Sequence, residues 1–474
     1  MPETVCPGRK ARIRSRSHGS SGVAIKRVPN HDSIVTTQLL SLMNKASVML
    51  RTFNRWGVGG AICLSCVSAF VANIVAGDWP SFRGPAGQGV TVDTGFPTSW
   101  SETENVRWKI ELPNRGNESP VVASGSVFVT SATDDGAERR LHCFNREDGS
   151  EKWTRKIEFE AGEKTHQTNP FGAATPAVSG NKVVVWHGSA GLFCYDLAGE
   201  QLWSAQPGVV THIWGYGSSP VIHNGKVILN FGPGVAQAVV AYDLETGDEV
   251  WTHKEPGGTD DRGGSMVGSW STPVVADVGG ESQIVCSLPT RVVSLNPQDG
   301  SVIWSCDGLV GKNGNLVYTS PLISKGIGVA MGGYTGPALG FRLDGKGDVT
   351  ESHRLWHDDS KQPQRISSGV IVGDHIFMAN AGPGILQCLE LETGKEVWKD
   401  RGPGANHWGQ MCFADGRLYV TNQKSQTVVF SPDIEKYEQL AVNSLDGSSN
   451  STPAFSDGEI FLRTSKSLYC ISTK

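Results

Sequence analysis

Residues 175–203 read TPAVSGNKVVVWHGSAGLFCYDLAGEQLW and hold, in order, every part of a unit that recurs along this chain. The unit opens with a hydroxylated residue and a proline at 175–176, and a turn leads into an apolar strand at 183–185. A third segment follows, and the turn after it carries Gly199, four residues before Trp203. Proline is tolerated where a strand starts, and glycine supplies the positive φ of tight hairpin turns. The unit therefore predicts four short strands joined by turns.

The apolar strand of this unit recurs at spacings of 42 to 57 residues. A period in that range, with strands and turns but no helical pattern, is typical of a β-propeller. The sequence therefore predicts an all-β fold, an eight-bladed propeller of four-stranded blades. The eight apolar strands are 127–129, 183–185, 227–229, 284–286, 327–329, 376–378, 418–420 and 460–462.

Most units share the opener and the closing tryptophan. The openers that precede a proline are Ser119, Thr175, Ser219, Thr272, Ser320 and Thr452. Two units depart from this pattern, with Ser368-Gly369 and Gly409-Gln410 in its place. The tryptophans four residues after a turn glycine are Trp153, Trp203, Trp251, Trp304 and Trp398. Trp356 fills the position in the fifth unit, whose turn differs, and the seventh unit lacks it.

The two ends of the repeat region are complementary. The eighth unit stops at Lys474 without a fourth strand, and residues 106–110 upstream of the first unit look like an orphan fourth strand around Trp108. Pairing this segment with the last blade would close the ring and remove the free sheet edges. We therefore expect the strand near Trp108 to complete the eighth blade.

Charge is divided unevenly along the 474 residues. Residues 1–55 carry ten Lys and Arg against two Asp and Glu, whereas residues 78–474 carry 32 against 45. An acidic body disfavours a phosphate-backbone partner, so no nucleic acid is expected. The seven cysteines after residue 78 include no adjacent pair and no CxxC, and four of them occupy one repeat position, which is typical of small buried apolar residues.

The N-terminal region has the order of a secretory signal. An uncharged, mostly apolar stretch from Trp56 to Ala76 follows two arginines and ends in small residues at 75–77. A start at Met43 or Met49 would give a signal of ordinary length, which makes residues 1–42 an upstream extension from a misassigned start. The alternatives are a retained membrane anchor and lipidation at Cys66. We predict an exported protein, periplasmic or associated with the cell envelope, and no other membrane contact.

Three regions follow: an extension with the signal at 1–77, a strap at 78–104 and the propeller at 105–474. The strap begins with DWPSFRGP at 78–85. Trp79 and Phe82 are expected to anchor it on the propeller surface, with Arg83 available for a stacking or carboxylate contact. The alternative is a docking motif for a partner.

The openers and the Gly-x-x-x-Trp closers together resemble the pyrroloquinoline-quinone-like repeat propellers over about residues 105–474. This resemblance implies one of three groups: quinoprotein alcohol and sugar dehydrogenases, the lipoprotein subunit of the outer-membrane barrel assembly machinery, or secreted bacterial propellers without an assigned role. The segment 78–85 looks like the start of the third group. Fold alone does not choose among the three groups.

The resemblance also bears on cofactors. Dehydrogenases of this kind hold their quinone over calcium, cap it with a ring formed by two neighbouring cysteines and use an Asp as base. The cysteine pair is absent from this sequence, and loop acids such as Asp260 and Asp261 match no family spacing. No cofactor and no metal are expected, with pyrroloquinoline quinone plus calcium as the alternative.

The segments just before the openers carry the strongest functional signal. Each opener begins an innermost strand, so these segments should face a central funnel on one side of the ring. A mixture of aromatic rings, His, Asn and Arg suits a polar ring-shaped ligand or a peptide. The alternative is that the aromatic rings only plug the channel. The predicted funnel residues are His166, Asn169, His212, Trp214, Tyr216, Trp270, Tyr318, Arg365, His407 and Trp408.

No residue is assigned a catalytic role, because no nucleophile elbow, phosphate loop or spaced carboxylate pair occurs. We predict a non-catalytic propeller that acts as a ligand-binding or protein-assembly module, with an unknown protein partner or a small polar or glycan ligand in the funnel. The first alternative is a quinone-dependent oxidoreductase with an atypical site. The second is a polysaccharide-binding or polysaccharide-processing protein.

Overall fold

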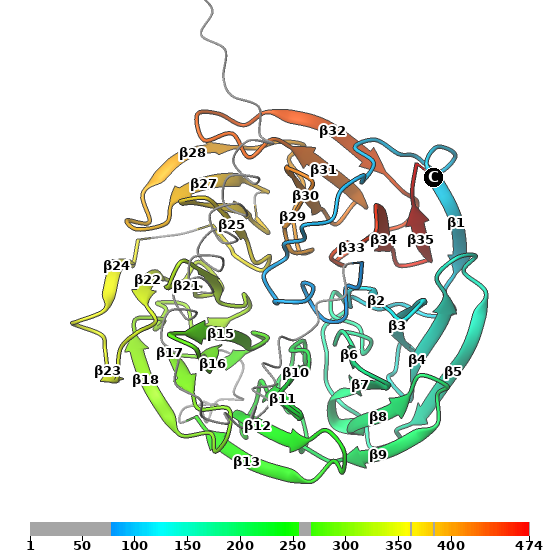
Figure 1. Cartoon of the computed structure of the whole chain (residues 1–474), viewed down its shortest axis with the longest axis horizontal. Coiled ribbons are helices and arrows are strands. Elements are labelled where there is room, and N and C mark those ends of the chain that lie inside the picture. The colour runs from blue at the N-terminus through cyan, green and yellow to red at the C-terminus, as the bar shows by residue number, and fades with distance from the viewer. Residues whose placement is uncertain (1–76, 256–266, 361–362, 383, 474) are drawn as a thin grey trace, which may run out of the picture. The chain divides into compact units, whose positions relative to one another are not determined.

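The computed structural model describes residues 77–255, 267–360, 363–382 and 384–473. Within these ranges, eight sheets of four main strands stand in a ring, as Figure 1 shows. The first strand of each sheet lies nearest the axis of the ring and the fourth lies at the rim. The predicted eight-bladed propeller is therefore confirmed. In the same ranges, no helix is long and apolar enough to cross a membrane.

The blades, numbered along the chain, are antiparallel, and their strands run in order from the axis to the rim. Blade 1 is β2 (Val121–Ala123), β3 (Ser126–Ala132), β4 (Glu138–Asn145) and β5 (Glu151–Glu158). Blade 2 is β6 (Ala177–Ser179), β7 (Lys182–Trp186), β8 (Leu192–Asp196) and β9 (Gln201–Ala205). Blade 3 is β10 (Val221–His223), β11 (Lys226–Phe231), β12 (Ala238–Asp243) and β13 (Glu249–Lys254). Blade 4 is β15 (Val274–Val278), β16 (Glu281–Ser287), β17 (Arg291–Leu295) and β18 (Val302–Asp307).

The second half of the ring repeats this order. Blade 5 is β20 (Leu322–Ser324), β21 (Ile327–Met331), β22 (Ala338–Arg342) and β24 (Arg354–Asp358). Blade 6 is β25 (Val370–Val372), β26 (His375–Ala379), β27 (Leu386–Glu390) and β28 (Glu396–Asp400). Blade 7 is β29 (Cys412–Ala414), β30 (Arg417–Thr421), β31 (Gln426–Phe430) and β32 (Gln439–Ser444). Blade 8 is β33 (Ala454–Ser456), β34 (Glu459–Arg463), β35 (Ser467–Ile471) and β1 (Val106–Glu111).

Three short strands and one helical turn lie outside this scheme. β23 (Gly347–Asp348) pairs in parallel with β18. β14 (Val267–Ser269) and β19 (Asn315–Val317) pair in parallel in the loops before blades 4 and 5. A 3-10 turn, η2 (Gly188–Ala190), connects β7 to β8.

The burial of each strand follows its place in the blade. The second strands β21 and β34 are buried at every position, because neighbouring blades cover both faces of each sheet. The eight apolar strands predicted from the sequence all fall in these second strands. Outermost strands are more exposed, and in β9 only Trp203 is buried.

The ring closes where the sequence predicts. β1 pairs antiparallel with β35, and Trp108 lies opposite Cys470. Figure 1 shows β1, near the start of the chain, as the outer edge of the blade that holds the last strand. The N-terminal strand therefore supplies the outermost strand of blade 8.

Six of the closing tryptophans dock their blade onto the next one. The indole N–H of Trp203 donates to the Leu244 carbonyl of the following blade at 2.9 Å. A Cβ on the turn residue Gly247, which has φ +79°, would lie 2.7 Å from the Trp203 ring. Glycine is therefore needed at this turn for two reasons: the backbone has a positive φ, and a side chain would collide with the tryptophan of the preceding blade. The same donor geometry is found for Trp108, Trp153, Trp251, Trp356 and Trp398.

One tryptophan departs from this geometry. The indole N–H of Trp304 donates to the Gln283 side chain of its own blade at 3.0 Å. The next blade is the fifth, whose turn lacks the Gly-x-x-x-Trp form. Without that turn as acceptor, the Trp304 N–H is satisfied within blade 4.

The openers form a second circle of contacts near the axis. Seven of the eight opener positions donate their N–H to the side chain of the next one, as in Ser119 to Thr175 at 3.0 Å. Gln410, in a unit without the usual opener, keeps this pattern because its side-chain oxygen accepts from the Ser368 N–H. The further links are Thr175 to Ser219, Ser219 to Thr272, Thr272 to Ser320, Ser320 to Ser368, and Gln410 to Thr452.

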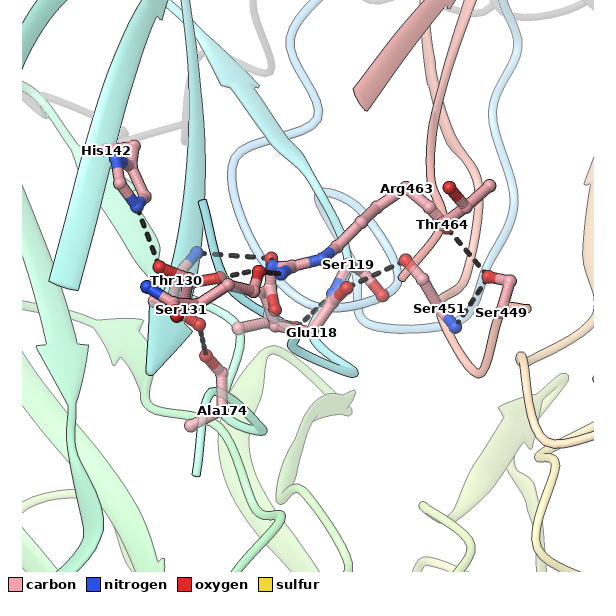
Figure 2. A network of polar contacts seen from close by, with 12 residues as sticks. Glu118, Ser119, Thr130, Ser131, His142, Ala174, Ser449, Ser451, Arg463 and Thr464 are labelled. Carbon is pink, nitrogen blue, oxygen red and sulfur yellow. Dashed lines mark hydrogen bonds and ion pairs between the residues drawn. The ribbon is translucent and has the colours of Figure 1, made fainter. Parts of the chain in front are cut away.

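A buried ion pair reinforces the seam between blades 8 and 1. Figure 2 shows the Arg463 guanidinium reaching the Glu118 carboxylate, and both side chains are fully buried. Arg463 also donates to the carbonyls of Thr130 and Asn114. The Ser451 hydroxyl donates to the Glu118 carbonyl at 2.7 Å. The seam therefore has an ionic contact in addition to the docked Trp108.

Residues 78–104 run across the ring on the side of the turns that follow the innermost strands. Trp79 pairs with Val122 of blade 1 and is fully buried. Further on, Gln88 accepts a hydrogen bond from Ile323 N of blade 5, and Gly89 pairs with Phe413 of blade 7. Because these blades lie on different sides of the axis, the segment crosses that mouth of the ring.

Candidate functional site

A cavity of about 360 Å³ lies on the axis of the ring. The loop before every one of the eight innermost strands contributes to its lining, which is the convergence that the sequence predicts. Two walls of different chemistry face each other across it. The aromatic wall consists of Trp214, Trp270, Tyr318 and Tyr334. The amide wall consists of Asn117, Asn169, Gln364, Gln410 and Asn450.

The rings of the aromatic wall touch one another. The centroids of Trp270 and Tyr318 are 5.2 Å apart, and those of Trp214 and Trp270 are 6.0 Å apart. Trp214 and Tyr334 stack with an interplanar angle of 17°. Contacts of this kind favour fixed ring orientations, so the wall presents a continuous apolar surface.

Backbone pairing holds this wall in place. β14 and β19 bring two of its loops together, and Trp270 N donates to Val317 O at 2.8 Å. The indole N–H of Trp270 donates to Gly215 O at 2.9 Å, which fixes the ring against the loop that carries Trp214. The wall is therefore built on paired backbone rather than on free loops.

Tyr334 comes from a hairpin within blade 5 and not from a loop before an opener. Tyr334 and Thr335 are consecutive non-glycine residues with φ of 51° and 67°. Gly333 beside them lets the hairpin approach, because a Cβ there would lie 2.3 Å from the Tyr318 ring. Left-handed conformations cost energy for residues with a side chain and concentrate at functional sites. The run GGYTG at 332–336 was the sequence signal for this contributor.

The amide wall is partly engaged with the loops themselves. The Asn169 amide donates to the carbonyls of Trp214 and Tyr216, both at 2.8 Å. Asn450 donates to Asn117 and to the Thr168 carbonyl. The two side-chain N–H groups of Asn117, Asn169 and Asn450 are thus all engaged by neighbouring loops, so these amides orient the loops that line the cavity.

Six of the ten predicted funnel residues line the cavity: His166, Asn169, Trp214, Trp270, Tyr318 and Trp408. His212 lies behind the aromatic wall and is 1% exposed, with its ring edge-to-face against Trp270 at 4.8 Å. Its Nδ1 accepts from the Trp214 backbone N–H at 3.2 Å. His212 therefore supports the wall from behind.

The other three predicted residues also lie outside the lining. Tyr216 is buried against Trp186, and its hydroxyl donates to the Phe171 carbonyl. Burial lowers the pKa of His407 to about 4, which leaves this imidazole neutral at physiological pH. Arg365 lines a separate cavity between blades 5 and 6, and burial lowers its pKa to about 10.

The strap contributes a lining residue that the funnel prediction missed. Phe82 lines the cavity from the mouth that residues 78–104 cross. Arg83 is fully buried beside it and donates to the carbonyls of Gln88 and Gly369. The expected stacking or carboxylate contact of Arg83 is thus replaced by backbone carbonyls, which tie the strap to blade 6.

The cavity is electrically neutral in its described lining, which contains no Lys, Arg, Asp or Glu. Burial raises the pKa of Tyr318, so its phenol stays protonated and can both donate and accept. In the described ranges, no group of three His, Cys, Asp or Glu could hold a metal ion, and all seven cysteines are free and buried. Asp260 and Asp261 lie outside the described residues.

Comparison with known proteins places this fold among its relatives. No curated protein sequence matches the chain. Two solved structures illustrate the similarity: BamB from Moraxella catarrhalis and the quinohemoprotein alcohol dehydrogenase ADHIIG from Pseudomonas putida HK5. The first is 12% identical with a TM-score of 0.56 and covers 77% of this chain and 99% of its own. The second is 11% identical with a TM-score of 0.55 and covers 83% and 80%. At such identities the similarity shows the fold alone.

The sequence itself matches a family profile. The family described as outer membrane protein assembly factor BamB, a group of pyrroloquinoline-quinone-like repeat proteins, matches over residues 85–160 and 137–400. These two matches overlap and together cover more than half of the chain. This protein therefore belongs to the BamB-like family of pyrroloquinoline-quinone-like repeat propellers.

Proposed function

We propose that this protein is a non-catalytic binding propeller of the cell envelope that holds a small neutral ligand in the axial cavity. The observation that carries the proposal is the lining: rings and amides from loops of all eight blades face one space without a charged side chain among the described residues. Binding sites of this kind combine apolar faces with a few oriented hydrogen-bonding groups. Acid–base catalysis needs titratable groups at the reacting atoms. In the described lining, the exposed His166 is the only side chain whose ordinary pKa lies near neutral pH.

The lining also bears on the quinone-dependent alternative. Calcium takes six to eight oxygen ligands, with carboxylates prominent among them. The described cavity residues offer amide and hydroxyl oxygens but no carboxylate, and they offer no cation for an anionic quinone. The residues present therefore do not fit pyrroloquinoline quinone with calcium.

Placement in the envelope rests on two observations. The residues up to 77 have the charged, apolar and small-residue order of an export signal. The matched family is described by an outer-membrane assembly function. Both support export of the propeller, with the signal cleaved, retained or lipidated.

A second candidate function is a protein-assembly module, which the family description favours. In that case a protein partner would cover the mouth of the ring that carries the aromatic wall. Chemical crosslinking in the native envelope, followed by mass spectrometry, would recover one consistent partner crosslinked to the loops before the openers. Recovery of no consistent partner would contradict this candidate.

The binding proposal is tested with the full chain and a mixture of small neutral compounds that includes polyols, nucleosides, capped dipeptides and disaccharides. Saturation-transfer NMR should detect at least one of them on the native protein. The signal should disappear in Trp270→Ala and persist in Leu202→Ala, a truncation on the exposed outer strand β9. No transfer to any compound, or equal transfer in Trp270→Ala, would refute the proposal.

A further inference from the structure

We infer that the ligand of the axial cavity is the terminal portion of a neutral oligosaccharide. The inference rests on the proposed binding function and assigns it a ligand class. Three features of the described residues carry it: the shape of the aromatic wall, the hydrogen-bonding groups left available around it, and the closure of the far mouth by the strap.

The aromatic wall has the form of a platform. Trp214 and Tyr334 are nearly parallel with centroids 6.0 Å apart. A sugar ring between two aromatic rings would need a separation of about 7–8 Å, twice the contact distance of ~3.5–4.0 Å between carbon atoms. The two stacked rings therefore leave no room for a sugar between them, and the apolar C–H face of a pyranose would lie on the part of the aromatic wall that faces the cavity.

The available polar groups complement a ring with hydroxyls on its edge. No described residue hydrogen-bonds the indole N–H of Trp214 or Trp408, the hydroxyl of Tyr318 or Tyr334, or the side-chain amide of Gln364. Phenols and amides both donate and accept, as a sugar hydroxyl requires. These groups come from blades 3, 5, 6 and 7, so they can reach hydroxyls along the part of the sugar edge that faces those blades.

The absence of charged side chains from the described lining restricts the class of ligand further. A uronic acid, a phosphorylated sugar or a free peptide terminus would bring a charge into a lining that holds no Lys, Arg, Asp or Glu among the described residues. An unpaired charge in a partly desolvated site is costly. A capped peptide would avoid this cost, but its hydrogen-bonding groups lie along one direction and not around a ring.

The closed far mouth selects the end of a glycan chain. Phe82 lines the cavity from the strap, whose contacts reach blades 1, 5 and 7. Because the strap lies across this mouth, a polysaccharide would have to pass it to thread through the ring, so we expect only a chain end to enter. The cavity lies near the lower limit of the ~300–1,000 Å³ that small-molecule sites occupy, which corresponds to about one or two sugar units.

The test measures binding of the full chain to defined probes by isothermal titration calorimetry. The neutral probes are linear cello-, xylo-, manno- and malto-oligosaccharides of increasing length. The competing classes are oligogalacturonides and a neutral tripeptide capped at both ends. We expect one neutral series to bind, with an affinity that rises up to about two units and then stays constant, because the cavity holds about that many and the strap lies across its far mouth.

Variants then locate the site. Trp214→Ala should weaken binding at least about tenfold through loss of the platform, whereas Trp214→Phe should recover most of the affinity. Leu202→Ala serves as the matched control and should bind like the native protein. Phe82→Ala should remove the length limit, so that longer oligosaccharides gain affinity. Circular dichroism melting identifies any variant that fails to fold. If Trp214→Ala does not fold, Tyr334→Ala replaces it as the variant that disrupts the aromatic wall.

The outcomes separate this inference from the proposed function. Preference for oligogalacturonides or for the capped tripeptide would refute the neutral glycan and leave a binding cavity in place. An affinity that keeps rising with length in the native protein would refute recognition of a chain end. Binding of neutral fragments in the NMR test without binding of any neutral oligosaccharide would refute the inference alone. Failure of both tests would refute the inference and the proposed function together.

Discussion

Two sets of tryptophans in this propeller differ in location, in burial and in the hydrogen bonding of the indole N–H. The rim tryptophans lie on outermost strands, and each donates its indole N–H to the next blade. The cavity tryptophans lie in loops on the axis and are half-buried beside open space. The rim set comprises Trp108, Trp153, Trp203, Trp251, Trp356 and Trp398, and the cavity set comprises Trp214, Trp270 and Trp408.

The difference lies in what surrounds each ring. A rim tryptophan such as Trp203 is 7% exposed, has a satisfied N–H and lies against a glycine that makes room for it. Trp214 keeps an indole N–H that no described residue engages, and one face of its ring adjoins a cavity. The rim set therefore stabilises the ring, and the cavity set is available for a ligand.

The largest contrast should appear between Trp203→Ala and Trp214→Ala. Removing the buried Trp203 ring should cost about 3–5 kcal/mol of unfolding free energy, the usual range for a buried tryptophan. Trp214→Ala should cost much less, because its ring is only half-buried. Urea unfolding followed by circular dichroism measures both. Similar losses in the two variants would contradict the division between the two sets.

A mutation in the ion pair between blades 8 and 1 tests whether the docked Trp108 alone is enough to close the ring. Glu118→Gln keeps the shape of the side chain but leaves the Arg463 guanidinium buried without its carboxylate. Breaking a buried pair in this way should cost about 3–5 kcal/mol. The double variant Glu118→Gln/Arg463→Met should recover part of that loss, since it removes the unpaired charge. Urea midpoints that place the double variant below the single one would contradict the ionic role of this pair.

A comparison of two glycines distinguishes the cost of losing the tryptophan contact from the cost of placing a side chain at a positive φ. Gly225 and Gly247 both have positive φ in blade 3, but only Gly247 has a tryptophan within reach of an added Cβ. Gly225→Ala should cost about 1–2 kcal/mol for the left-handed backbone alone. Gly247→Ala should cost a further 1–3 kcal/mol or so, because the methyl group collides with the Trp203 ring. Equal melting temperatures would show that docking does not depend on the glycine.

Acid should weaken the blades and the cavity region through histidines that are buried in the neutral form. Burial lowers the pKa of His142 and His187 to about 3 and that of His407 to about 4. Below the ordinary histidine pKa of about 6.5, the unfolded chain binds protons that these folded imidazoles do not, so stability falls as the pH falls.

Each of the three histidines should cost about 1.4 kcal/mol between pH 7.5 and pH 5.5. The measurement is the urea midpoint at the two pH values for the native protein and for His142→Gln. Since the variant lacks one titrating group, its midpoint should depend less steeply on pH. A steeper dependence in His142→Gln would contradict a buried neutral His142.

The fold was predictable because its signals are local and repeated. A hydroxylated opener, an apolar strand and a glycine four residues before tryptophan each indicate one turn or one strand. The apolar strand occurs eight times, the opener before proline six times and the Gly-x-x-x-Trp turn five times, and this repetition predicts one architecture. The orphan strand around Trp108 was identifiable for the same reason, since the eighth unit lacked a fourth strand. The role of Gln410 was not identifiable, because only the circle of openers shows that its longer side chain replaces a hydroxyl.

The candidate site was predictable only as far as the loops that build it. The repeat predicts that the residues before each opener lie at the axis, and Trp214, Trp270 and Tyr318 line one cavity there. Within an irregular loop, however, spacing does not set the direction of a side chain. For this reason His212 and Tyr216, on either side of Trp214 in the same loop, are buried away from the cavity that Trp214 lines.

The amino-acid sequence by itself determined the number of blades, their strand order and the way the ring closes, because hydrogen-bonded turns and alternating burial depend on neighbours along the chain. Tertiary structure alone decided that Tyr334 joins the aromatic wall, that Phe82 of the strap lines the cavity, and that the lining is neutral among the described residues. These features depend on contacts between segments that are hundreds of residues apart or in different blades. Such contacts exist only once the ring has formed.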